Sequence, residues 1–247
     1  MAEITGTNGN DTKNGGAEAD LIRLLGGNDR SYGYDGNDTM VGGWADDTLY
    51  GYDDNDRING GGGVDVLEGG NGNDRVAGGG GDDDIGGGYG NDTLDGGSGR
   101  DTLEGSYGDD VIDGGAGRDQ LDGGSGADRF AFDEGDSGVG SDVRDVIYRV
   151  DANASDRIDL RAIDANTGAS GDQAFTFIGN SAEGASFTAA GQIRVVPLDS
   201  NGNPRTDPDA LVYDYLIQLN TGGSLDPDIE ILVTLWDSDP SATWFLP

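Results

Sequence analysis

Apolar residues recur at every ninth position through the first half of the chain. Counted from Gly6, the sequence divides into fourteen units of nine residues that run without interruption to Ala131. The eighth residue of a unit is apolar in all but two units, which carry Lys13 and Ser31 instead. The apolar residues at this position are Ile22, Met40, Leu49, Ile58, Leu67, Val76, Ile85, Leu94, Leu103, Ile112, Leu121 and Phe130. A fixed period of this kind predicts a repeat architecture.

The polar positions follow the same period. The sixth residue of every unit is aspartate: Asp11, Asp20, Asp29, Asp38, Asp47, Asp56, Asp65, Asp74, Asp83, Asp92, Asp101, Asp110, Asp119 and Asp128. The first residue is glycine except at Leu24, and glycine also dominates the second and fourth positions. The exceptions include Leu25, Tyr34 and Tyr52 at the second position, and Glu18, Ala45 and Asp54 at the fourth.

The unit glycine-glycine-x-glycine-x-aspartate-x-apolar-x resembles the nonapeptide repeat of the RTX (hemolysin-type calcium-binding) family. The resemblance covers residues 6–131, about half of the chain. It implies an all-β fold, a right-handed parallel β-roll or β-helix, in which the fourteen sixth-position aspartates bind calcium.

The residue types suit that chemistry. Calcium takes six to eight oxygen ligands from carboxylates and backbone carbonyls, and glycine permits the positive φ angles that turn carbonyls inward. We expect a six-residue turn and a three-residue strand in each unit, with two units forming a coil of eighteen residues. Seven coils at about 4.8 Å make a rod of roughly 30 Å.

Aspartates eighteen residues apart then line the same edge of the rod, and calcium fits between successive turns. Seven turns on each edge leave at most about twelve such positions. Because the early units depart from the pattern, we expect about 8–12 calcium ions, held mainly from Gly60 onward.

Charge decides whether this chain can fold alone. It has 48 acidic and 14 basic residues, a net charge of −34, and 48 glycines, a composition that by itself indicates disorder. One apolar side chain per unit contributes about 1.5–3 kcal/mol, too little to offset about 1–2 kcal/mol of backbone entropy per residue. Eight to twelve Ca²⁺ would add roughly +16 to +24. Folding is therefore expected to depend on calcium. A loose glycine–aspartate linker is the alternative, and the regular apolar position argues against it.

The composition changes after residue 131, and we expect a β-rich cap over residues 132–247. Strand-like runs lie at 143–150, 173–179, 192–196, 211–219 and 229–236. Residues 156–179 resemble the C-terminal segment of serralysin-type metalloproteases, which in that family closes the roll beside the secretion signal. Residues 237–247 resemble an uncleaved type I secretion signal, or they form a last packed strand.

Absent residue types narrow the function. The chain has no cysteine and no histidine, which excludes most zinc sites and histidine triads, so serralysin-type proteolysis is not carried over and we expect no enzyme. There is no apolar run long enough for a membrane span and no N-terminal signal peptide. The acidic surface argues against nucleic-acid binding.

The leading hypothesis is a secreted, extracellular calcium-binding protein that leaves the cell through the type I apparatus and folds outside. One alternative is an adhesion or matrix module that binds extracellular polysaccharide. It rests on tyrosines eighteen apart, Tyr32 with Tyr50, Tyr34 with Tyr52 and Tyr89 with Tyr107, with Trp44 expected near the first set. Another is the C-terminal export and folding portion of a larger secreted enzyme such as a protease.

Overall fold

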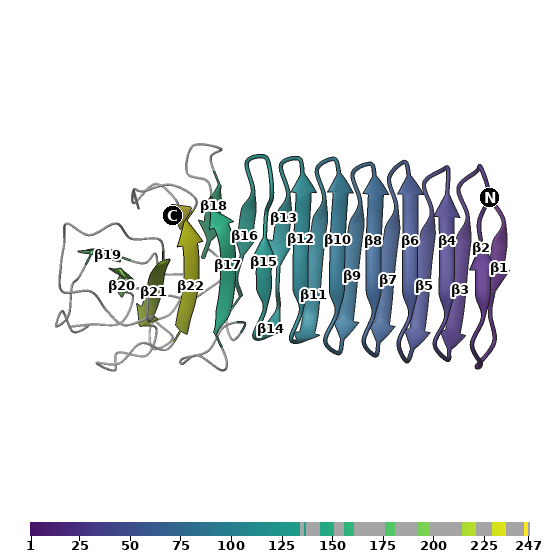
Figure 1. Ribbon diagram of the computed structural model, residues 1–247, viewed down its shortest axis with the longest axis horizontal. Coiled ribbons are helices and arrows are strands. Elements are labelled where there is room, and N and C mark those ends of the chain that lie inside the picture. Colours follow the sequence, from purple (N-terminus) through teal and green to yellow (C-terminus); the bar gives the residue numbers. More distant parts are fainter. Residues whose placement is uncertain are drawn as a thin grey trace, which may run out of the picture.

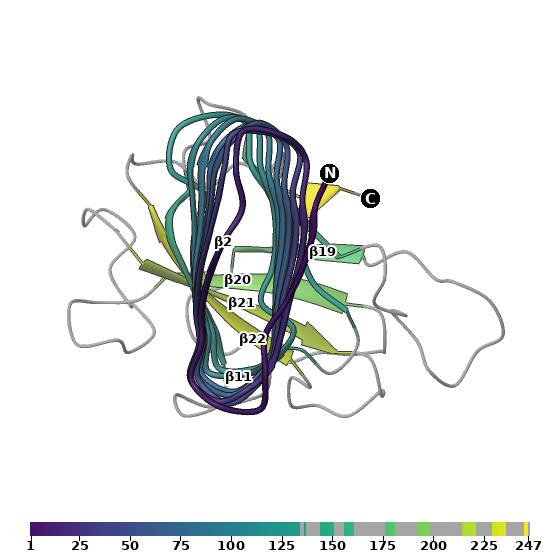
Figure 2. The ribbon, with the colours of Figure 1, turned by 90° about the vertical axis from the view of Figure 1, so that its right-hand side faces the viewer.

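Stacked coils of β-strand build a rod from the N-terminus toward the C-terminal strands (Figure 1). The computed structural model describes residues 1–133, 136, 144–150, 156–160, 176–180, 192–197, 214–220, 229–235 and 245–246. Viewed along the rod, successive coils superimpose as one flattened loop with a sheet on each long side (Figure 2).

The two sheets take alternate strands of the chain. The first sheet runs β1 (Glu3–Thr5), β3 (Leu21–Gly26), β5 (Thr39–Trp44), β7 (Arg57–Gly62), β9 (Arg75–Gly80), β11 (Thr93–Gly99), β13 (Val111–Asp113), β16 (Arg129–Ala131), β18 (Arg157–Asp159) and β23 (Phe245–Leu246), with β14 (Ala116–Gly117) also beside β11. The second runs β2 (Thr12–Asn14), β4 (Arg30–Tyr34), β6 (Thr48–Asp53), β8 (Val66–Asn71), β10 (Asp84–Tyr89), β12 (Thr102–Tyr107), β15 (Gln120–Asp122), β17 (Asp145–Val150), β22 (Ile229–Leu235), β21 (Asp214–Asn220), β20 (Gln192–Pro197) and β19 (Thr176–Asn180).

Strand pairing within the repeats is parallel and shifted by eighteen residues. Ile58 of β7 pairs with Val76 of β9, and Leu67 of β8 pairs with Ile85 of β10. The predicted all-β parallel roll with two units per coil is therefore confirmed.

The strands are longer than the sequence pattern suggested. A typical strand has six residues, as in Arg57–Gly62, whereas we expected three. Pairing continues into the next unit because the glycines at its second and third positions also join the ladder, as Gly61 with Gly79 and Gly62 with Gly80. Only three residues are left for a turn, such as 63–65.

Glycine is common at the second and fourth positions because the backbone there adopts a positive φ. Gly61 and Gly63 have φ of 109° and 135°, and these two positions repeat a positive φ in each unit from the third onward. The same conformation is adopted by Leu25, Tyr34, Ala45, Tyr52, Asp54 and Ser106. A left-handed conformation costs an L-residue roughly 1–2 kcal/mol, so the stacked coils impose it on these six.

The core is a column of eighth-position side chains. All twelve apolar residues at this position are at most 3% exposed. Ser31 is also fully buried, and its hydroxyl donates a 2.8 Å hydrogen bond to the Lys13 carbonyl. Lys13 is partly exposed and forms an ion pair with Asp11 at 3.2 Å. Each of the first two coils therefore has only one apolar side chain at the eighth position, whereas each later coil has two.

Beyond the repeats, all five predicted strand regions contain strands: β17, β19, β20, β21 and β22. The roll continues into this part, since Leu121 of β15 pairs in parallel with Ile147 of β17 and Phe130 of β16 with Ile158 of β18. The pairs β20–β21 and β21–β22 are antiparallel. Among the described residues, no helix is long and apolar enough to cross a membrane.

Outward-facing tyrosines stack on the second sheet. Ring centroids are 5.6 Å apart for Tyr32 and Tyr50, 5.5 Å for Tyr34 and Tyr52, and 4.7 Å for Tyr89 and Tyr107, so all three predicted stacks are confirmed. Trp44 was wrongly expected near the first set. It ends β5, a strand of the other sheet, because alternate units occupy opposite faces.

Candidate calcium sites

The sixth-position aspartates form two ladders, one along each edge of the rod. The first ladder precedes the strands of the second sheet and contains Asp11, Asp29, Asp47, Asp65, Asp83, Asp101 and Asp119. The second precedes the strands of the first sheet and contains Asp20, Asp38, Asp56, Asp74, Asp92, Asp110 and Asp128. Asp38 and all later members of both ladders are at most 3% exposed. The structure thus brings the predicted residues together as two columns.

Each rung of a ladder is a hydrogen bond between coils. The backbone N–H of Asp65 donates to Oδ1 of Asp83 at 2.8 Å, and that of Asp83 donates to Oδ1 of Asp101 at 2.8 Å. In the second ladder, the N–H of Asp74 donates to Oδ1 of Asp92 at 2.8 Å. One carboxylate oxygen of each aspartate therefore fixes the spacing of two coils.

The other oxygen has no protein donor. From Asp29 to Asp128, the Oδ2 atom of all twelve ladder aspartates is buried and lacks a hydrogen-bond partner. Leaving a buried charged oxygen unpaired is costly, so buried charges in proteins are paired or coordinate metals. The two columns of Oδ2 atoms require either protons or cations.

The first-position glycine lets two oxygen atoms approach the backbone closely. A Cβ added to Gly96 would lie 2.6 Å from Oδ2 of Asp101 and 2.5 Å from the carbonyl oxygen of Gly114, one coil further on. A carboxylate oxygen and a carbonyl oxygen from the next coil thus lie close to the same glycine, with no side chain between them. First-position glycines from Gly33 to Gly105 repeat this arrangement, and oxygen donors of these two kinds are the ligands that calcium prefers.

Leu24 changes one position of this series. It stands where other units have the first-position glycine, and its side chain is fully buried. The third unit therefore begins with a buried side chain instead of a glycine, while Oδ2 of Asp29 is buried without a hydrogen-bond partner like those of the later aspartates. From Asp38 to Asp110 the arrangement is regular, including the units before Gly60 from which we expected weaker sites.

No group of three or more histidine, cysteine, aspartate or glutamate side chains converges to hold a metal within the described part of the chain. Each candidate position must therefore draw most of its ligands from backbone carbonyls. That composition fits a hard cation such as calcium better than zinc.

Burial raises the pKa of the ladder carboxyls. It raises the pKa of Asp65 and Asp92 to about 7 and that of Asp119 to about 8. Neighbouring carboxylates in the ladder add to the increase, and the N–H donated by the preceding aspartate opposes it. Deprotonating the whole ladder near neutral pH therefore opposes folding unless a cation is bound.

Asp11 and Asp20, in the first coil, differ from the later aspartates. Oδ2 of Asp11 accepts a 2.6 Å hydrogen bond from the Thr7 N–H, and Oδ1 pairs with Lys13 at 3.2 Å. The Thr7 hydrogen bond is the main cause that lowers the pKa of Asp11. Oδ1 of Asp20 accepts from the N–H of Ala2 at 2.6 Å. Asp11 is thus already satisfied by protein groups, unlike the twelve that follow Asp20.

Comparison with protein families matches the repeats directly. The model of the RTX calcium-binding nonapeptide repeat, which spans four copies, matches residues 5–40, 32–67, 41–76, 59–94, 68–103, 95–130 and 104–143. Together these matches cover residues 5–143, more than half of the chain. The chain belongs to the RTX calcium-binding repeat family. The nonapeptides of this chain are therefore calcium-binding repeats of the RTX type.

Solved structures give two distant likenesses for this RTX chain. The AlgE6R2 subunit of the mannuronan C5-epimerase from Azotobacter vinelandii is 22% identical, with a TM-score of 0.41 over 69% of this chain and 90% of that one. The AlgE6R3 subunit of the same enzyme is 22% identical, with a TM-score of 0.35 over 82% and 78%. No curated protein sequence matches the chain. The fold assignment rests on the strand pairing described above.

Two aspartates outside the RTX repeats continue the ladders, and the repeat pattern did not reveal them. The N–H of Asp119 donates to Oδ1 of Asp145 at 2.8 Å, and the N–H of Asp128 donates to Oδ1 of Asp156 at 3.0 Å. These partners lie 26 and 28 residues away instead of eighteen. Their signal in the sequence is the triplet aspartate-x-isoleucine, which copies positions six to eight of a unit.

Proposed function

We propose that this RTX chain is a secreted protein whose roll folds when extracellular calcium fills the two ladders. The observation that carries the proposal is the double column of twelve buried Oδ2 atoms without protein partners. At neutral pH these carboxylates repel one another across neighbouring coils, and calcium would neutralise them. Binding and folding then become one equilibrium.

Individual ligands follow from the geometry. The ladder aspartates from Asp38 to Asp128 would hold calcium together with backbone carbonyls, including those of the first-position glycines. Asp29 lies in the unit altered by Leu24, and Asp11 is engaged by Thr7 and Lys13, so these two contribute less. The proposed complement stays at about 8–12 ions.

Calcium concentration would then separate the unfolded from the folded chain. Extracellular modules bind calcium at about 10⁻⁴–10⁻³ M, far above cytosolic levels, so the acidic repeats would remain unfolded inside the cell and suit threading through a type I exporter. The serralysin-like segment 156–179 and the signal-like segment 237–247 support this route in sequence. Of the two, residues 161–175, 237–244 and 247 lie outside the described residues.

We propose that the roll has no catalytic activity of its own. In each ladder carboxylate from Asp29 onward, one oxygen accepts a hydrogen bond from a backbone N–H of the preceding coil. This arrangement supports a structural role for these acids. If the chain is the export and folding portion of a larger secreted enzyme, the same calcium-dependent folding would serve that enzyme.

Hydrodynamic radius measured by dynamic light scattering tests the proposal. The hydrodynamic radius of the full chain at pH 7.5 should decrease on addition of calcium and should increase again with EGTA. Magnesium at equal concentration serves as the control because it demands a tighter octahedral shell. An identical radius in calcium and in EGTA would contradict calcium-driven folding.

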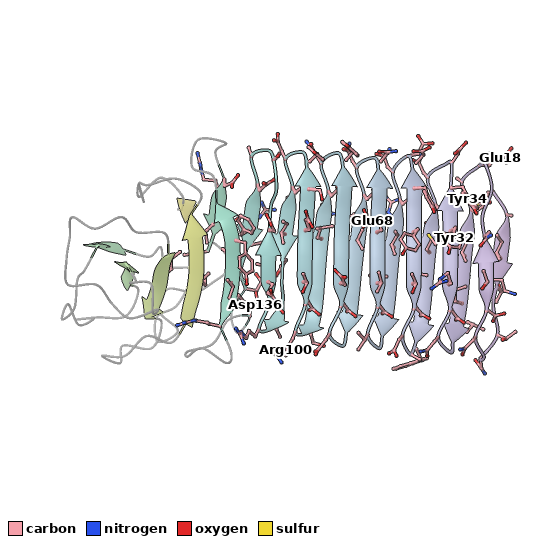
Figure 3. All side chains as sticks on the ribbon, viewed as in Figure 1. Glu18, Tyr32, Tyr34, Glu68, Arg100 and Asp136 are labelled. Carbon is pink, nitrogen blue, oxygen red and sulfur yellow. The ribbon has the colours of Figure 1, made fainter. Side chains whose placement is uncertain are left out.

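A second candidate function is binding of a neutral polysaccharide on the second sheet. A groove there is lined by Tyr52, Glu68, Gly70, Asn71, Gly88, Tyr89, Ser106 and Tyr107. Tyr52, Tyr89 and Tyr107 are 45%, 60% and 54% exposed, so their rings are open to stack on a sugar face. Figure 3 shows Glu68 on the same sheet as Tyr32 and Tyr34.

Affinity electrophoresis in gels that contain neutral polysaccharides tests this second candidate. Tyr89→Ala combined with Tyr107→Ala should reduce retention, because a sugar ring stacks on exposed aromatic rings. Trp44→Ala removes an aromatic residue that is 77% exposed on the other sheet and should leave retention unchanged. Equal retention of wild type and the double variant removes the groove as the binding site.

A further inference from the structure

The junction between the repeats and the C-terminal strands has the same construction as a gap between two coils of the roll. Within the repeats, each gap has two bonds that recur. The N–H of Asp101 donates to Oδ1 of Asp119 at 2.8 Å, and the N–H of Gln120 donates to the Asp101 carbonyl at 2.8 Å. These two bonds place one ladder aspartate over another.

Both bonds are present again at the junction on the first ladder. The N–H of Asp119 donates to Oδ1 of Asp145 at 2.8 Å, and the N–H of Val146 donates to the Asp119 carbonyl at 2.8 Å. Ile147 is fully buried in register with Leu121, as an eighth-position residue would be. Asp145 therefore occupies the place of the next sixth-position aspartate.

The second ladder ends in the same way. The N–H of Asp128 donates to Oδ1 of Asp156 at 3.0 Å, and the N–H of Arg157 donates to the Asp128 carbonyl at 2.7 Å. Ile158 is fully buried opposite Phe130. Two aspartates outside the nine-residue register thus take the ladder positions of an eighth coil, one on each edge.

An independent observation indicates a ligand in these two gaps. Asp119 and Asp128 are fully buried, and the Oδ2 atom of each has no hydrogen-bond partner. Each Oδ2 lies beside the first-position glycine of its own unit, Gly114 or Gly123, as in every earlier unit except the one that begins with Leu24. The carboxylates of Asp145 and Asp156 are themselves 0% and 2% exposed.

We propose that Asp145 and Asp156 each complete a further calcium site outside the repeats, the first with Asp119 and the second with Asp128. The inference rests on the proposed calcium-dependent folding of the roll. It adds that calcium fastens the C-terminal strands β17 and β18 to the last coil, so that their docking depends on the same ion. The pairing of β22 with β17 and of β23 with β18 extends this attachment to both C-terminal strands.

Counting bound calcium tests the two junction sites. Asp145→Asn and Asp156→Asn each keep an oxygen that can accept the N–H of Asp119 or Asp128 while removing the negative charge. At 10 mM calcium, native mass spectrometry of the full chain should show one ion fewer for each variant and two fewer for the double variant. Asp84→Asn removes an exposed carboxylate next to Asp83 and should leave the count unchanged.

Hydrogen exchange gives a second measurement on the same samples. Amides of 145–150 should exchange at least tenfold faster in Asp145→Asn than in wild type, while amides of 57–62 keep their protection. Unchanged ion counts in both folded variants would overturn the junction sites while leaving the roll intact. A wild-type chain that binds no calcium would overturn the proposed function instead.

If a variant does not fold, the wild-type chain still provides a test of the junction sites. In crystals of the wild-type chain grown with Tb³⁺ in place of calcium, anomalous density should lie beside Asp119 and Asp145, and beside Asp128 and Asp156. Anomalous density confined to the earlier coils would overturn the proposal.

Discussion

Replacing Gly96 by alanine is the sharpest perturbation of a single calcium position. The added methyl would lie 2.6 Å from Oδ2 of Asp101 and 2.5 Å from the Gly114 carbonyl oxygen, roughly 1 Å closer than ordinary van der Waals contact. Overpacking of this kind costs about 1–3 kcal/mol. The Asp101 carboxylate and the Gly114 carbonyl must shift to make room for the methyl, so an ion that these two oxygens bind should be lost.

The lost ion adds to the packing cost. A site with a dissociation constant near 10⁻⁴ M stabilises the folded state by about 2.7 kcal/mol at 10 mM calcium. Gly96→Ala should therefore lower the free energy of unfolding by about 4–6 kcal/mol. The assay is urea unfolding at 10 mM calcium, followed by circular dichroism, together with an ion count.

Gly80→Ala is the matched control. Gly80 lies at the third position of the neighbouring strand β9, and its added Cβ would meet only Ser98 Oγ, at 3.4 Å. The change in unfolding free energy should stay within about 1 kcal/mol. Equal urea midpoints and ion counts for the two variants would refute the assignment of calcium to the Asp101 carboxylate and the Gly114 carbonyl oxygen.

Two further predictions concern protons and the core. In EGTA, acidification from pH 8 to about pH 4.5 should increase the β-sheet signal in circular dichroism, because burial raises the pKa of Asp65 and Asp92 to about 7 and of Asp119 to about 8. A carboxyl whose pKa is higher in the folded than in the unfolded state stabilises the fold at low pH, and this stabilisation is lost as the pH rises through the pKa of the folded state. A β-sheet signal that does not change with pH would contradict this prediction. Leu103→Ala, at a fully buried position, should lower stability by about 2–5 kcal/mol and raise the calcium midpoint, whereas the exposed Thr102→Ala should change neither.

Much of the roll could be predicted because equivalent residues of successive coils are always eighteen residues apart in the sequence. The pairing of Ile58 with Val76 and the alignment of Asp65 with Asp83 both follow once two units form one coil. Strand length did not follow, because glycine at the second and third positions indicates a turn by composition. Only the contact of Gly61 with Gly79 in the next coil shows that these residues extend the strand.

The ends of the ladders could not be predicted from the period. Asp145 and Asp156 align with Asp119 and Asp128 through hydrogen bonds that span 26 and 28 residues, so no fixed spacing marks them. Leu24 presents the opposite case, because its departure from the pattern is evident in the sequence but only the structure shows that its side chain is fully buried. Both features are decided by packing between coils.

Calcium-dependent folding is the central claim, and far-UV circular dichroism during a calcium titration with EGTA reversal tests it most directly. At pH 7.5 without calcium, the full chain should give a spectrum dominated by disorder, since twelve buried Oδ2 atoms would be charged and unpaired in the roll. Added calcium should produce a cooperative gain of β-sheet signal that EGTA abolishes. A β-sheet spectrum that persists unchanged in excess EGTA would contradict the account.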